Sequence, residues 1–149
     1  MKKNLLRIMG LVVILSFGFL LLAGAGKDPA EKQVITLLEK RTIIMENILS
    51  RKVTFEEGKE RLKEIEKGSL YKRDVKVLSQ YENSDYVKTM DMDVVSIENT
   101  GNLYDKKKYI CEIQWTFLDY EGEKEETKIY DVCVEWDGSR NKLITFQMQ

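Results

Sequence analysis

The stretch 109-YICEIQWTFLDYEGEKEETKIYDVCVEW-136 decides the fold, because each of its two halves alternates apolar and polar residues. A period of two places every second side chain on one face of a β-sheet. The apolar positions of the two halves are Tyr109, Cys111, Ile113, Trp115 and Phe117, then Tyr130, Val132, Val134 and Trp136. The stretch is therefore predicted to form a long antiparallel hairpin with one wide apolar face.

The turn of this hairpin is predicted at Gly122-Glu123, where glycine takes the first position that a type II′ turn requires. This turn sets Trp115 opposite Tyr130 and Cys111 opposite Val134, with both apolar sets on one face. A slip of one residue would turn the acids of the second half toward the core. The hydrophobic pattern therefore argues against such a slip.

Two helices are predicted before the first strand. Asp28-Pro29 supplies an N-cap and a proline at the first helical position of a helix that runs to about Ser50. Thr54 opens a capping box for a second helix, which is expected to end near Lys67 with Gly68 as its left-handed stop. Both helices carry apolar residues at helical spacing and are predicted to cover the apolar sheet face.

The other strands have weaker signals. Alternation from 74 to 82 predicts a short strand, and a clearer strand at 87–98 changes phase after Val94, which indicates a bulge or a bend. Residues 99–108 have the composition of a turn and loop. A last strand is expected to carry Ile144, Phe146 and Met148 on the core face, and its register pairs Val134 with Ile144.

Residues 1–26 have the features of an export segment, separate from a single domain at 27–149. Basic residues precede an uncharged run from 8 to 26, and Ala23-Gly24-Ala25 supplies a signal peptidase site after Ala25. The alternative is an uncleaved anchor, because the uncharged run rises about 28 Å as a helix, close to the hydrocarbon thickness. Either way the basic start predicts an exported domain, secreted or anchored at the outer face of the cytoplasmic membrane.

Composition argues against several classes of function. The net charge is −1, and about −4 once the basic start is set aside, which argues against nucleic acid. Histidine is absent, which disfavours hydrolase and zinc chemistry but leaves carboxylate mechanisms open. The sequence has no P-loop, dinucleotide fingerprint, zinc spacing, EF-hand loop or catalytic triad. We therefore expect no catalytic residue, no metal and no cofactor.

The two cysteines are predicted to be unbridged. The hairpin places Cys111 inward and Cys133 outward on neighbouring strands, so that their Cβ atoms point apart. Cys111 is then a core residue, and Cys133 is a half-exposed thiol. The pair Asp91 and Asp93 and the run at 106–108 are interpreted as solvated surface.

The candidate ligand-binding residues are Trp115, Tyr130 and Trp136, which share the apolar face of the hairpin. They either line a concave pocket beneath the helices or fill the core. Aromatic stripes on strands are usually core, so the second interpretation competes directly with the first.

The expected fold is α+β: an N-terminal signal or anchor helix, then two helices packed on one face of a curved antiparallel sheet of four to five strands. The order of elements, helical at 29–68 and stranded at 74–149, resembles the cystatin-like and nuclear transport factor two-like superfold, which includes small extracytoplasmic domains of bacterial envelope proteins. This resemblance is architectural and transfers no functional residue.

The functional expectation combines export with the missing catalytic motifs. We expect a non-catalytic, exported or membrane-anchored binding or scaffold module of the bacterial cell envelope. Its partner would be another envelope protein or a second copy, with membrane contact through residues 8–26 if these are retained. The alternative is a small-ligand binder or a carboxylate-based enzyme that uses a pocket on the concave sheet face.

Overall fold

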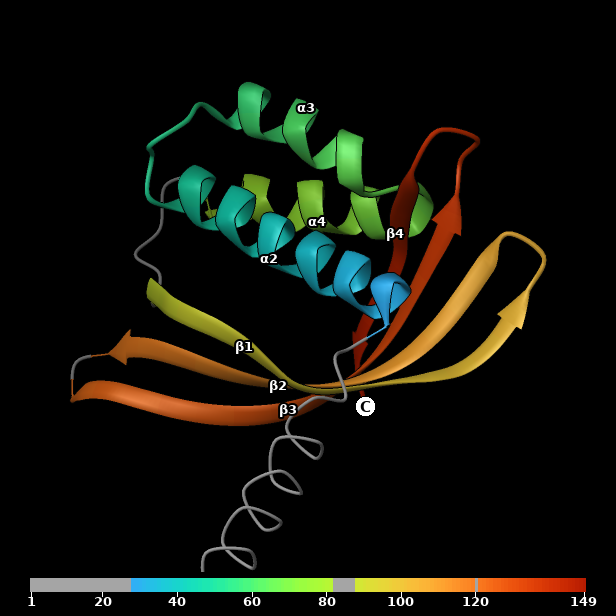
Figure 1. The fold of residues 1–149 in the computed structure, drawn as a ribbon. Helices are drawn as coiled ribbons and strands as arrows, with labels where there is room; N and C mark the ends of the chain where they lie inside the picture. Colours follow the sequence, from blue (N-terminus) through green and yellow to red (C-terminus); the bar gives the residue numbers. More distant parts are fainter. Residues whose placement is uncertain (1–27, 82–87, 120) are drawn as a thin grey trace, which may run out of the picture.

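The computed structural model describes residues 28–81, 88–119 and 121–149, and over these the chain forms three helices on one face of a four-stranded sheet (Figure 1). The helices are α2 (Pro29–Leu49), α3 (Phe55–Ile65) and α4 (Gly68–Tyr81). The strands are β1 (Lys88–Leu103), β2 (Lys106–Asp119), β3 (Gly122–Trp136) and β4 (Asn141–Met148), antiparallel and adjacent in chain order. The α+β class is as expected, with one helix more than the sequence predicted.

The expected export segment lies outside the described residues. Among the helices that the structure describes, none combines the length and the apolar character needed to cross a bilayer.

The predicted helix starts at Asp28 and Thr54 are both confirmed. The Asp28 carboxylate accepts a hydrogen bond from the Ala30 amide at 3.1 Å, and the Thr54 hydroxyl accepts one from the Glu57 amide at 3.2 Å. Gly58 lets α3 approach α2 closely, since a Cβ at this position would lie 2.2 Å from a side-chain carbon of Ile48. α3 ends at Ile65, and Gly68, which was predicted to terminate it, is instead the first residue of α4, with φ +68°.

The strand predicted at 74–82 is wrong, because residues 74–81 form the second half of α4, and Glu82 lies outside the described residues. Val77 and Tyr81, two of the alternating residues that suggested a strand, are exposed on the helix. The buried positions are Leu70, Asp74 and Leu78, which recur every four residues as on one helix face. The sequence did not reveal this helical period, because Asp74, the middle of the three buried positions, is acidic and interrupts the apolar pattern.

The central hairpin has a different register from the predicted one. Asp119 pairs with Gly122, so the turn falls before Gly122, and Trp115 lies opposite Glu126 and not Tyr130. The two registers differ by an even number of residues, so the same side chains still share the helix-facing side. The faces were therefore predicted correctly although the partners were not.

Bulges shape both outer strands. The predicted phase change in β1 is confirmed as a bulge at Val95, and β1 continues to Leu103 through part of the predicted loop. In β4 the pairing slips between Cys133 and Val134, so that Val134 lies opposite Leu143 and not Ile144. Leu143 is therefore buried, whereas Met148, expected in the core, is half exposed.

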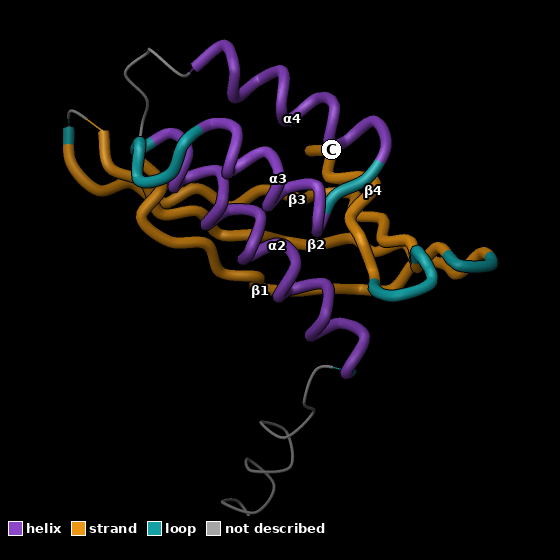
Figure 2. Tube along the Cα trace, turned by 90° about the horizontal axis from the view of Figure 1, so that it is seen from above, coloured by secondary structure: helices purple, strands orange, loops and turns teal. Residues whose placement is uncertain are grey.

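The three helices lie over one face of the sheet, and their apolar side chains form the core with it (Figure 2). α2 packs against β1, α4 packs against β4, and α3 lies on the outer side of α2 and α4 (Figure 1). One apolar cluster joins α2 and α4 to the sheet, around Leu38 and Ile113. A second, around Leu62 and Leu78, joins the three helices to one another.

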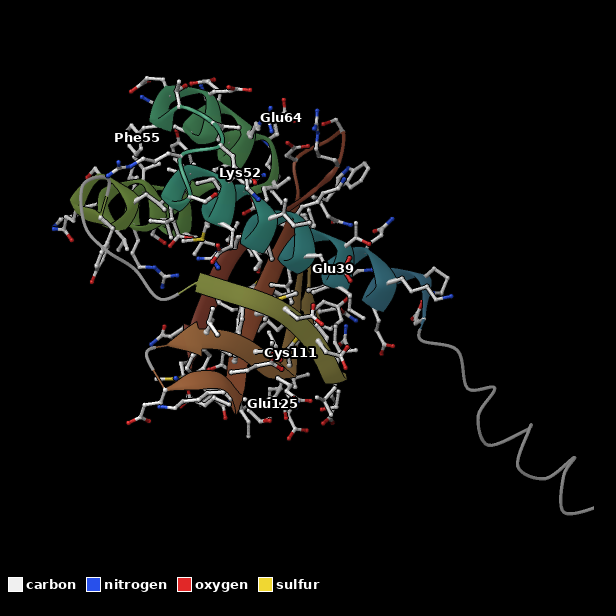
Figure 3. The ribbon with its side chains drawn as sticks, turned by 90° about the vertical axis from the view of Figure 1, so that its left-hand side faces the viewer. Glu39, Lys52, Phe55, Glu64, Cys111 and Glu125 are labelled. Carbon is white, nitrogen blue, oxygen red and sulfur yellow. The ribbon has the colours of Figure 1, made fainter. Side chains whose placement is uncertain are left out.

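Neither cysteine is joined in a disulfide, as predicted, and both are buried. Cys111 lies on the sheet beneath α2, whereas Glu125 lies on the face away from the helices (Figure 3). Cys133 is 8% exposed, so the expected half-exposed thiol is wrong. β3 has a paired strand on each side, and Lys108 and Thr145 flank this small side chain. Burial raises the pKa of the Cys133 thiol, with Lys108 opposing that shift, which argues against a reactive thiolate.

Candidate functional site

The structure brings two of the three predicted site residues together. The Trp115 indole N–H donates to the Tyr130 hydroxyl at 3.1 Å, and the two rings meet edge to face with centroids 6.2 Å apart. Tyr130 also stacks on Phe146 at 4.4 Å between centroids. Trp136 is the last residue of β3, where it is half exposed.

Trp115 and Tyr130 border an open hollow of about 350 Å³ on the sheet. Thr89, Phe117, Glu126 and Lys128 complete its lining. The Glu126 carboxylate pairs with the Lys128 ammonium at 2.9 Å. The hollow therefore offers aromatic surface, while its acid is already neutralised by a cation.

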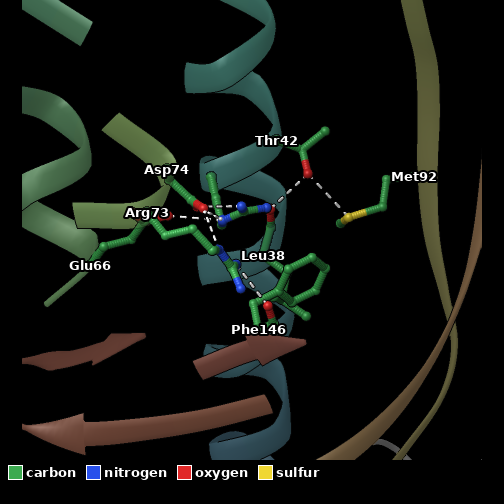
Figure 4. Close-up of polar contacts among 8 residues, drawn as sticks. Leu38, Thr42, Glu66, Arg73, Asp74, Met92 and Phe146 are labelled. Carbon is green, nitrogen blue, oxygen red and sulfur yellow. Dashed lines mark hydrogen bonds and ion pairs between the residues drawn. The ribbon is translucent and has the colours of Figure 1, made fainter. Parts of the chain in front are cut away.

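A buried charge cluster lies where the three helices meet β4. The Arg41 guanidinium, from α2, contacts the carboxylates of Glu66 (2.9 Å) and Asp74 (2.9 Å from Nε). Figure 4 shows Glu66, Asp74 and Arg73 converging beside α2. Arg41, Glu66 and Asp74 are each less than 10% exposed, and Arg41 also lies 4.6 Å from the centroid of the Phe146 ring.

The surroundings of the Glu66 carboxyl favour its neutral form. Burial raises its pKa to about 8, the attraction of Arg41 opposes this shift, and the charge of Asp74 adds to it. One Glu66 oxygen has no hydrogen-bond partner in the described chain. A neutral Glu66 leaves Arg41 and Asp74 as a balanced buried ion pair.

The cluster was missed in the sequence, although a signal exists. Arg41 continues the spacing of Val34 and Leu38 along the buried face of α2, and Asp74 continues that of Leu70 on α4. A charged residue on an apolar stripe predicts a buried partner of opposite sign. All three side chains are buried, so the cluster acts on packing and does not reach a substrate.

A larger groove lies between α2, α3 and the turn that joins β3 to β4. It encloses about 900 Å³, and its rim carries Lys32, Lys40, Arg61 and Arg140 against one lining acid, Glu64. Figure 3 labels Glu64 on α3. Trp136, separated from the other predicted aromatic residues, lines this groove.

The β3–β4 turn is held rigidly, which fixes one wall of the groove. The Asp137 carboxylate accepts hydrogen bonds from the backbone amides of Arg140 and Ser139, both at 3.0 Å. These bonds, the Arg140 amide first, hold the pKa of Asp137 well below its ordinary value. Lys142 adds an ion pair at 3.3 Å. Arg140 and Trp136 are thus carried on a preorganised turn.

Other candidate residues are dispersed. Asp91, Asp93 and the lysines at 106–108 are exposed, in agreement with their interpretation as solvated surface. Within the described ranges, no group of His, Cys, Asp or Glu side chains is arranged to hold a metal ion.

Comparison with known proteins yields a fold likeness alone. No protein-family model and no curated protein matches the chain. The chain is similar to the crystal structure of the intermembrane space region of the chloroplast protein ARC6, with a TM-score of 0.53 and 13% sequence identity, over 78% of this chain and 94% of that one. The α+β arrangement of helices and sheet is thus shared with a solved domain, and the resemblance to the cystatin-like superfold stays a prediction.

Proposed function

We propose that this chain is a non-catalytic binding module of the bacterial cell envelope, exported or membrane-anchored, and that it binds a partner through the groove between α2, α3 and the β3–β4 turn. The observation that carries the proposal is the groove itself, where four cations and a half-exposed tryptophan lie on a rigid frame. A preformed surface of this kind suits binding, because little ordering is needed when the partner arrives. The export features of residues 1–26 support the envelope location.

The distribution of carboxyl groups supports a non-catalytic role. Glu66, whose pKa lies in the range of a general acid, is 2% exposed and faces Arg41. A general acid or base must come within hydrogen-bond reach of its substrate. Glu66 is closed off from any such contact by the helices around it.

A second candidate function rests on the hollow beside Trp115 and Tyr130. Its exposed aromatic surface suits a small planar or apolar ligand. The pairing of Glu126 with Lys128 favours binding over acid chemistry at this place. Ligand-induced shifts confined to the NMR signals of Trp115 and Tyr130 would favour this function over partner binding at the groove.

Site-specific photo-cross-linking in the native cells tests the proposal. A photoreactive amino acid replaces Lys40 in the groove, and a matched control carries it at Lys76, exposed on α4. We expect position 40, and not position 76, to give one discrete adduct, whose second component mass spectrometry identifies. Equal adducts at both positions, or none at position 40, would contradict binding through the groove.

Cell fractionation with intact-mass measurement tests the location. A species that begins at Gly26 outside the cells supports a secreted module, and a full-length membrane species supports an anchored one. A full-length species free in the cytoplasm would overturn the envelope assignment.

A further inference from the structure

We infer that the groove binds an extended peptide segment in which acidic residues alternate with apolar ones. The inference rests on the proposed function, because it names the chemistry of the partner that the groove would accept. It follows from the charges, the apolar floor and the dimensions of this surface.

The groove carries an excess of unneutralised positive charge. Lys32, Lys40 and Arg140 line it, and none of them makes an ion pair within the part of the chain that the structure describes. Arg61, by contrast, is paired with Glu57 at 2.6 Å. Unpaired cations gathered on one surface of a chain with a net negative charge favour an anionic partner.

The floor of the groove is apolar, which distinguishes a peptide from a phosphate polymer. Leu37 and Ile44 of α2 are partly buried, Ile65 of α3 is buried, and the Trp136 ring is 49% exposed. A chain of phosphates has no group to cover these side chains. A peptide with apolar residues between its acids would bury them and place a side chain against Trp136, the kind of residue that dominates binding energy in peptide and protein interfaces.

The spacing of the cations suits an extended chain. Lys32 and Lys40 are separated by eight residues of α2, which corresponds to about 12 Å along the helix axis. An extended peptide covers about the same length in four residues, so acids at alternate positions reach both lysines.

Polar groups for the peptide backbone lie between these lysines and the turn. The Asn141 side-chain amide donates to the Gln33 side-chain oxygen at 2.9 Å. Within the described chain this bond leaves the Gln33 amide nitrogen as a donor and the Asn141 oxygen as an acceptor. An extended backbone presents both complementary groups.

The test uses the full-length chain in detergent and a fluorescein-labelled octapeptide in which Glu alternates with Leu. Three competitors separate the chemistries: the same peptide with Gln for Glu, the same peptide with Ser for Leu, and inorganic polyphosphate. Fluorescence anisotropy gives the Kd of the labelled peptide and the affinity of each competitor. We expect the Glu-Leu peptide to bind at least tenfold more tightly than either altered peptide, with an affinity that falls as salt rises.

Charge reversal locates the site. The double variant Lys32→Glu with Lys40→Glu is expected to weaken binding at least tenfold. The matched control reverses Lys72 and Lys76, two exposed lysines of α4 that also make no ion pair in the described chain, and is expected to change the Kd less than twofold. In a Trp115→Phe background, Trp136 emission should shift to shorter wavelength as the peptide covers the ring.

The outcomes separate this inference from the proposed function. Polyphosphate that binds better than the peptide, or two double variants that weaken binding equally, would overturn the acidic-peptide assignment. Absence of peptide binding overturns it too, and the cross-link at position 40 then decides the rest. A discrete adduct would support a binding module whose partner has another chemistry. Absence of an adduct would contradict both the acidic-peptide inference and the proposed binding function.

Discussion

Lys40 and Arg41 are consecutive on α2, yet their cationic groups lie in opposite environments. Arg41 is 7% exposed and is enclosed by two carboxyl groups, one from Glu66 at the C-cap of α3 and one from Asp74 on α4. Lys40 is exposed at the groove and makes no ion pair in the described chain. α2 therefore directs Lys40 toward solvent and Arg41 into the interior of the protein.

The difference shows how burial assigns the role of a charge. A buried cation must be matched inside the fold, because an unpaired charge in the interior is strongly destabilising. An exposed cation stays hydrated and contributes little to stability, so it remains available to a partner. The buried cluster is accordingly expected to act on folding and the groove on binding.

The largest expected effect is the loss of the buried cation. Arg41→Leu leaves Asp74 buried without its main counter-ion and removes the contact with Phe146. We expect the free energy of unfolding to fall by about 3–5 kcal/mol. Urea denaturation followed by far-UV circular dichroism measures the change.

Arg73→Leu is the control for this prediction. Arg73 contacts the same Asp74 at 3.1 Å, but about half of its side chain is exposed. Its loss is expected to cost about 1 kcal/mol or less. Equal destabilisation by the two substitutions would show that burial does not separate these cations.

The second expected effect is a pH dependence of the free energy of unfolding, caused by the titration of Glu66. Its pKa is about 8 in the folded chain, above the ordinary value of 4.5 that applies when unfolded. Below pH 4.5 both states hold the proton. As the pH rises from 4.5 to 8 only the unfolded state releases it, so folding stability falls through this window and levels off above it.

Glu66→Gln removes this loss, because the amide stays neutral and its oxygen still accepts from Arg41. The variant is expected to match the wild type near pH 4.5 and to exceed it by a few kcal/mol at pH 8. Urea titrations at both pH values measure the difference. Glu64→Gln, on the exposed side of α3, controls for the loss of one carboxyl group. A difference between Glu66→Gln and the wild type that does not grow with pH would contradict the neutral buried carboxyl.

Strand faces were more predictable from the sequence than strand partners. The alternation of Cys111, Ile113 and Trp115 depends on a local period of two, and the even difference between registers preserved it. The turn position depends on which of several nearby residue pairs closes the hairpin, and Gly122 misled because it begins β3. Bulges at Val95 in β1 and at Ile144 in β4 shift the pairing of these strands with their neighbours, and a strict alternation of side chains does not predict such shifts.

The sites were less predictable than the fold, because they join distant segments. Caps at Asp28 and Thr54 are encoded within four residues and were found. The groove combines α2, α3 and a turn that begins more than 70 residues after the end of α3, and only tertiary packing brings these segments together. Trp136 was predicted to share a pocket with Trp115 and Tyr130, but it lines the groove with Lys32 and Lys40 instead.

The smallest expected effect on stability is that of a substitution in the groove, at Lys40, the neighbour of Arg41 on α2. Lys40→Glu changes an exposed residue without a described ion pair, so we expect the free energy of unfolding to change by less than about 0.5 kcal/mol. Chemical denaturation beside Arg41→Leu measures both neighbours under one condition. A loss above 2 kcal/mol for Lys40→Glu would mean that the groove lysine supports the fold. An unchanged stability, combined with weakened binding of the acidic peptide, would show that adjacent residues of α2 divide folding and recognition between them.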